Sequence, residues 1–155
     1  MPEASSIVMS KLFSDLIGQR VTFSEQQYPI NSAAKQIYCL YLIKPMDSTR
    51  VIKADMPLLT SLAGALIGLP LDSIKERVAD SKPNEALRDS LYEVMNIASR
   101  IVSVEHRAVF NGMYPDSIGL PSDVLKTLRD PGFASYFNVK IDSYEGGAFS
   151  LLAPW

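Results

Sequence analysis

Hydrophobic and polar positions in the first third of the chain predict one helix followed by strands. Residues 5–17 carry apolar side chains at helical spacing, and Gly18 follows as a residue that suits a helix end. A short strand is predicted over residues 20–24. Residues 44–48 have the composition of a turn and lead into another predicted strand over residues 49–54.

The strongest strand signal is the apolar run at residues 36–43. Both alternating sets of this segment are apolar, so neither face of the strand is marked for water. Such a strand is typical of the centre of a sheet with both faces covered, either by the chain itself or by a partner subunit on one side.

The middle and end of the chain predict helices and then a hairpin. A helix is expected from Pro57 to about Ile67, a short one over residues 71–79, and the longest periodic segment over residues 83–104. An irregular stretch with Asn111-Gly112 comes next, and a short helix is expected over residues 122–128. Residues 136–144 and 148–155 read as a hairpin. We therefore predict one α+β domain over residues 1–155, with an antiparallel-rich sheet packed against two long helices.

Composition narrows the classes of function without choosing one. The net charge of −2 gives no electrostatic case for nucleic acid or an anionic membrane as partner. Residues 1–18 lack the pattern of a secretory signal, and no apolar run approaches the ~20 residues that span a bilayer, so we expect the cytoplasm. Cys39 and His106 are the only residues of their types. They predict no metal site, and Cys39 is expected to be a buried apolar residue.

The longest predicted helix has two chemically distinct faces. At ~100° per residue, Leu87, Leu91, Met95, Ala98 and Val102 form an apolar stripe. The side opposite this stripe is polar, and its four residues lie within roughly 60° of one another on the same wheel. They are Asp89, Glu93, Asn96 and Arg100. A polar face of this kind is typical of any surface helix. Asparagine is unusual there because it is a poor residue for the middle of a helix.

The spacing Asp89-xxx-Glu93-xx-Asn96 resembles the signature of the CheC, CheX and FliY chemotaxis phosphatases, in which these residues lie on the solvent face of a long helix. The order of elements from residue 36 onward is also similar. The chain departs from the family where Arg100 replaces a glycine. The family also has a proline further along the chain, and here Pro115 comes somewhat before that position and Pro121 slightly after it. Residues 122–128 look like an insertion. Because the N-terminal helix carries no second Glu-xx-Asn, the chain resembles the single-site, CheX-like form.

The resemblance implies a phosphatase that hydrolyses the phospho-aspartate of a CheY-type response regulator. In that interpretation Asn96 orients the attacking water, Glu93 binds the regulator's active-site lysine, and Asp89 and Arg100 contribute to docking. The resemblance implies no cofactor of the chain's own, with magnesium expected on the regulator, and a homodimer.

Two further readings remain open. The alternative hypothesis is that the same helix binds a regulator or scaffold partner without hydrolysis. A third reading is a structural subunit that assembles through the strand at residues 36–43.

Overall fold

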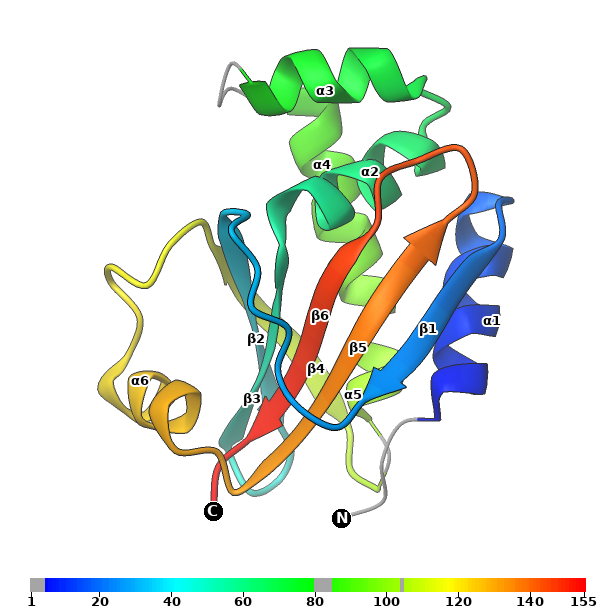
Figure 1. Cartoon of the computed structure of the whole chain (residues 1–155). Coiled ribbons are helices and arrows are strands. Elements are labelled where there is room, and N and C mark those ends of the chain that lie inside the picture. Colours follow the sequence, from blue (N-terminus) through cyan, green and yellow to red (C-terminus); the bar gives the residue numbers. More distant parts are fainter. Residues whose placement is uncertain (1–4, 80–84, 104) are drawn as a thin grey trace.

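The structure is a computed structural model that describes residues 5–79, 85–103 and 105–155. Its centre is an antiparallel sheet with the strand order β1-β5-β6-β3-β2-β4 (Figure 1). The strands are β1 (Val21–Gln26), β2 (Gln36–Ile43), β3 (Ser48–Asp55), β4 (Ala108–Tyr114), β5 (Phe133–Ile141) and β6 (Gly147–Ala153). The α+β class predicted from the sequence, with an antiparallel sheet, is confirmed.

Helices cover both faces of this sheet. They are α1 (Ser6–Ile17), α2 (Met56–Leu66), α3 (Leu71–Ala79), α4 (Glu85–Ile97), α5 (Ser99–Val102) and α6 (Ser122–Arg129). The larger core contains side chains of α1, α2, α4 and α5 together with one face of the sheet. The smaller core lies on the other face, beneath α6 (Figure 1). α3 packs on α2, further from the sheet.

Both ends of the first helix are capped, the second by the predicted Gly18. Ser5 precedes α1, and its hydroxyl accepts a hydrogen bond from the backbone N–H of Ile7 at 3.2 Å. Gly18 ends the helix with φ 70°, a left-handed conformation that glycine adopts without strain. Phe13 of α1 then stacks on Phe23 of β1, with ring centroids 5.4 Å apart.

Small residues in α2 allow α3 to pack closely. Gly64 is buried, and a Cβ atom at this position would lie 2.4 Å from Cδ1 of Ile74 in α3. The Tyr144 hydroxyl donates to the carbonyl of Leu69, at 2.8 Å, in the loop between the two helices. These contacts fix the position of α3, and with it Arg77, beside the rest of the helical layer.

The interpretation of residues 108–114 as irregular is wrong. These residues form β4, an edge strand that pairs with β2 and carries a register shift opposite Leu40 and Tyr41. Gly112, with φ 132°, accommodates the irregularity in this strand. The Asn111-Gly112 pair, which is typical of a turn, here belongs to a bulged strand, and that is why the pattern was misleading.

The two apolar faces of β2 are both covered within the chain. Ile37, Cys39 and Tyr41 are buried in the larger core. Leu40, on the opposite face, packs with Val124 of α6 in the smaller core. The apolar doubling that suggested a second subunit is therefore explained by α6. Cys39 is fully buried, as predicted.

The longest predicted helix is divided in two. α4 ends at Ile97, Ala98 is a turn residue, and α5 follows from Ser99 to Val102. Pro83 and Val104, the bounds predicted for the helix, lie outside the described residues. Ala98 keeps right-handed helical dihedral angles (φ −61°, ψ −15°), so the apolar periodicity continues through the break.

Candidate functional site

Helix α4 is held on the core by its apolar side. Leu87, Leu91, Val94 and Met95 are buried against the sheet and α2. The buried hydroxyl of Ser90 donates a 2.6 Å hydrogen bond to the carbonyl oxygen of Ala63 in α2. This attachment leaves the opposite side of α4 to solvent.

An aromatic group anchors the C-terminal half of α4. The Tyr41 hydroxyl donates to the Met95 carbonyl at 2.6 Å, and the Tyr41 ring packs on Phe110 of β4 with centroids 5.5 Å apart. The Phe110 ring in turn contacts the Tyr92 ring of α4, with ring centroids 5.8 Å apart. Burial raises the pKa of the Tyr41 phenol well above its ordinary range, and Cys39 adds to this rise. The phenol therefore stays protonated and able to donate.

The polar face predicted from the sequence is present on the outer side of α4. Asp89, Glu93 and Asn96 are exposed on this one helix, with Leu91 and Met95 buried behind them, as predicted. None of the three makes a hydrogen bond or ion pair with another described residue. Residues three positions apart in a helix have Cβ atoms about 5–6 Å from each other, so Glu93 and Asn96 can contact one ligand together.

Arg100 lies beyond the break, in α5, and is also exposed. Arg50 of β3 holds α5 against the sheet, because its Nη1 donates to the Val102 carbonyl at 2.7 Å. Burial lowers the pKa of the Arg50 guanidinium, while the charge of Glu105 acts in the opposite direction. Arg100 thus shares the exposed side with Asn96 but belongs to a separate helical segment.

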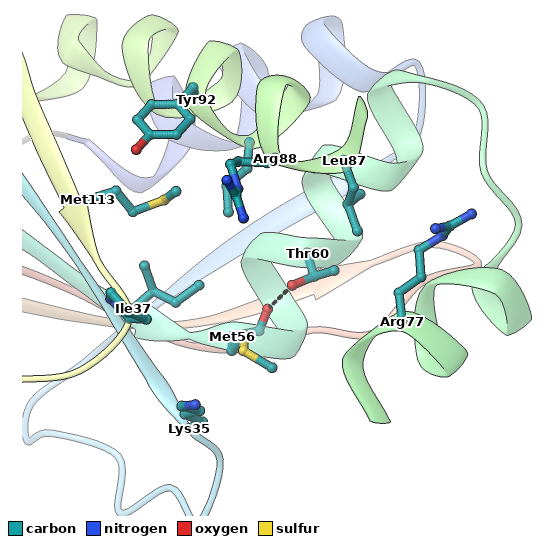
Figure 2. A pocket seen from close by; sticks show the side chains of 11 residues that line it. Lys35, Ile37, Met56, Thr60, Arg77, Leu87, Arg88, Tyr92 and Met113 are labelled. Atoms are coloured by element: carbon teal, nitrogen blue, oxygen red, sulfur yellow. Dashed lines mark hydrogen bonds between the residues drawn. The ribbon is translucent and has the colours of Figure 1, made fainter. Parts of the chain in front are cut away.

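A pocket on the flank of α4 was not predicted from the sequence. It has a volume of about 390 Å³ and lies where α4, α2 and the start of β2 meet (Figure 2). Arg88 and Tyr92 of α4 contribute to its wall. Its lining residues come from segments far apart in the chain, so no local motif marks it.

Two features of the described residues bear on other classes of function. No three His, Cys, Asp or Glu side chains there lie close enough together to hold a metal ion. No helix in the same residues is both long enough and apolar enough to cross a membrane.

The fold is that of the FliM middle domain and of FliY, a CheC-like architecture. No family model matches the sequence, and no curated protein matches it. Among solved structures, FliM in the FliM–SpeE complex from H. pylori matches with TM-score 0.64 and 12% identity, covering 96% of this chain and 81% of that one.

Two other structures give the same result. The FliG–FliM complex from H. pylori matches with TM-score 0.57 and 12% identity, covering 98% of this chain and 87% of that one. Thermotoga maritima FliY matches with TM-score 0.52 and 12% identity, covering 93% of this chain and 81% of that one. At identities this low, the structural matches establish the fold alone. They do not single out the CheX-like form, and function has to be argued from the site.

Proposed function

We propose that this chain docks a phosphorylated response regulator of the CheY type on the outer face of α4 and hydrolyses its phospho-aspartate. The observation that carries the proposal is the pair Glu93 and Asn96. Both side chains are exposed, adjacent and without a partner among the described residues, on a helix whose other side is fixed in the core. A docking site needs polar groups that are free in the unbound protein and held by a rigid support.

The chemistry requires little from this chain. An acyl phosphate is already reactive toward water, so the rate depends on placing one water in line with the phosphorus. The Asn96 amide offers both a donor and an acceptor for this water. The Glu93 carboxylate would form a charge-assisted hydrogen bond with a lysine of the regulator, which sets the register of docking. Magnesium and the phosphoryl group would both belong to the regulator.

The similar structures support a protein partner. FliM is known in complexes with SpeE and with FliG. We carry over from these complexes only the expectation that a domain with this fold binds other proteins. The class of partner, a regulator of the chemotaxis or flagellar-switch kind, rests on the Asp89, Glu93 and Asn96 pattern.

The test is the decay of a panel of regulators charged with acetyl phosphate, with and without this chain. Asn96→Ala should bind the regulator nearly as well as the wild type but slow the decay at least about tenfold, about 1.4 kcal/mol of transition-state stabilisation. Glu93→Ala should weaken both binding and rate. Glu25→Ala, an exposed change on the distant strand β1, is the matched control.

Binding without hydrolysis is the second candidate, and Arg100 is the observation that favours it. The exposed guanidinium lies four residues after Asn96, where the resemblance calls for glycine. If the wild type and Asn96→Ala both bind the regulator while neither changes its decay, the catalytic proposal is wrong. The docking function then stands alone.

A further inference from the structure

The pocket beside α4 is large enough for a small molecule. Its volume of about 390 Å³ lies within the range of ~300–1,000 Å³ that is usual for ligand sites. Its lining residues come from α2, α3, α4, the start of β2 and the end of β4. Arg88 and Tyr92 are the exposed residues of α4 that line it.

The charge on the pocket wall is of one sign. Lys35, Arg77 and Arg88 line the pocket, and no aspartate or glutamate is among the described lining residues. Figure 2 shows Arg88 extending from α4 toward the space between Thr60, Ile37 and Met113. Lys35 and Arg88 are exposed at the rim. Neither has a hydrogen bond or ion pair with another described residue.

Arg77 adds a buried polar atom that no other described residue satisfies. Its Nε is buried and has no hydrogen-bond partner among the described residues. A buried donor without a partner costs about 1–3 kcal/mol, so such a donor usually serves a ligand, an ion or water. The lining cations therefore come from three separate segments, and Figure 2 shows the Arg77 guanidinium turned away from the space that Arg88 enters.

The remainder of the lining is mostly apolar. Ile37, Leu87, Leu91 and Met113 supply aliphatic and thioether surface, and Tyr92 supplies an aromatic ring at the outer side. The Thr60 hydroxyl already donates its proton to the Met56 carbonyl at 2.7 Å, so it has no second proton to donate to a ligand. An apolar interior with a few convergent cations selects a ligand that has an apolar body and an anionic group.

We infer that this pocket binds a small organic anion. Its apolar body packs against Leu87, Leu91 and Met113, and its carboxylate or phosphate group pairs with Arg88, with Arg77 and Lys35 completing the positive wall. The planar guanidinium of Arg88 suits bidentate contact with either group. The partly enclosed site strengthens this attraction relative to open water. The inference does not depend on hydrolysis by α4.

Naphthyl phosphate, naphthoate and naphthol are matched probes, because they share one apolar body and differ in charge. Calorimetric titration should show both anions binding more tightly than neutral naphthol, by at least about tenfold for the phosphate. The order of the two anions shows whether the site prefers a phosphate or a carboxylate. Equal affinities for all three probes would overturn the inference.

Variants locate the binding. Arg88→Gln should lower the affinity for naphthyl phosphate at least about fivefold, because it removes a charged donor at the exposed rim without disturbing the core. Arg129→Gln, on α6 at the opposite face, should leave it unchanged. Arg77→Gln is a second variant, and its thermal unfolding is measured to confirm folding. An affinity unaffected by Arg88→Gln and Arg77→Gln contradicts the proposal.

Methyl NMR gives an independent readout. On addition of naphthyl phosphate, the methyl signals of Ile37, Met56 and Met113 should shift, while that of Met9, a buried residue of α1, should not. Shifts spread equally to Met9 would indicate non-specific binding and overturn the site. If an acidic, apolar peptide shifts the same methyls while the naphthyl anions do not, the pocket serves a protein segment instead, and the small-molecule inference fails.

Discussion

The Tyr41 hydroxyl donates a 2.6 Å hydrogen bond to the backbone carbonyl of Met95, the residue immediately before Asn96. Tyr41 lies in β2 and is fully buried, so the bond ties the last turn of α4 to an inner strand of the sheet, next to the edge strand β4. Asn96 projects from the other side of the same turn. The sheet therefore fixes the height and rotation of the helix at the residue proposed to orient water.

Tyr41→Phe should loosen this turn. The change leaves the Met95 carbonyl without its buried donor, so we expect the free energy of unfolding to fall by about 1–2 kcal/mol in urea titrations. Regulator dephosphorylation should slow while regulator affinity stays close to that of the wild type, because only the position of Asn96 is disturbed. Tyr38→Phe, on the opposite face of β2, is the control and should change neither quantity. A Tyr41→Phe variant with wild-type stability would show that the bond contributes nothing.

Alkaline pH should destabilise the fold through two neighbouring groups of β2. Burial raises the pKa of Tyr41 well above its ordinary 10.0 and that of Cys39 above its ordinary 9.0. Above pH 9.0 the unfolded chain begins to lose protons that the folded chain keeps, so the free energy of unfolding decreases as pH rises. The slope should reach up to about 1.4 kcal/mol per pH unit for each group.

Urea unfolding measured from about pH 8 to about pH 11 checks this slope. Tyr41→Phe and Cys39→Ala should each remove part of it, because the unfolded chain then has one proton fewer to lose. Tyr28→Phe, which alters an exposed phenol, should retain the wild-type slope. Identical slopes in all four proteins would mean that the buried groups do not control alkaline stability.

Asp55 should be important for joining three strands. Its Oδ1 accepts a 2.5 Å hydrogen bond from the Gln36 side chain, and its Oδ2 accepts from the Ala148 N–H at 2.8 Å. The residue is buried at the end of β3, with β2 and β6 on its two sides. Asp55→Ala should lower the free energy of unfolding by about 2–3 kcal/mol, because both donors lose a charged acceptor. Asp142→Ala, at an exposed position, is the matched control.

A neighbouring glycine tests the same contact from the other side. A Cβ atom at Gly147 would lie 2.6 Å from Oδ2 of Asp55, so Gly147→Ala should also destabilise the fold. The double variant with Asp55→Ala should lose less than the sum of the two single losses, because the clash and the hydrogen bond involve the same carboxylate. Strict additivity would argue against the contact.

Local patterns were sufficient for most of the fold. The helices at residues 5–17 and 71–79 and the strand at residues 36–43 were predictable because local apolar residues mark each of them, and Gly18 also marks the end of the first helix. β4 was not, because Asn111-Gly112 has the signature of a turn and pairing with β2 is a long-range property. The break at Ala98 leaves the helical period intact, so the sequence alone did not reveal it.

The candidate site divides in the same way. Asp89, Glu93 and Asn96 lie on one helix, and helical spacing alone predicts their shared exposed face. The pocket could not be predicted, since Lys35 and Arg77 meet Arg88 only through the packing of α2, α3 and α4. Likewise, only the tertiary structure shows that α6 covers Leu40 and accounts for the apolar second face of β2.

Arg100 provides a test of whether the proposed docking face on α4 admits a regulator. It is exposed in α5, and the Arg50–Val102 hydrogen bond holds that segment in place, so the guanidinium remains close to the docking face. If it obstructs approach, Arg100→Gly should raise kcat/KM at least about threefold toward a regulator that the wild type processes poorly. Arg100→Ala should do the same, and it separates loss of the guanidinium from the helix-weakening effect of glycine. Arg129→Ala is the distant control. A fall in both rate and affinity for the two Arg100 variants would instead show that the guanidinium binds an acidic group of the regulator.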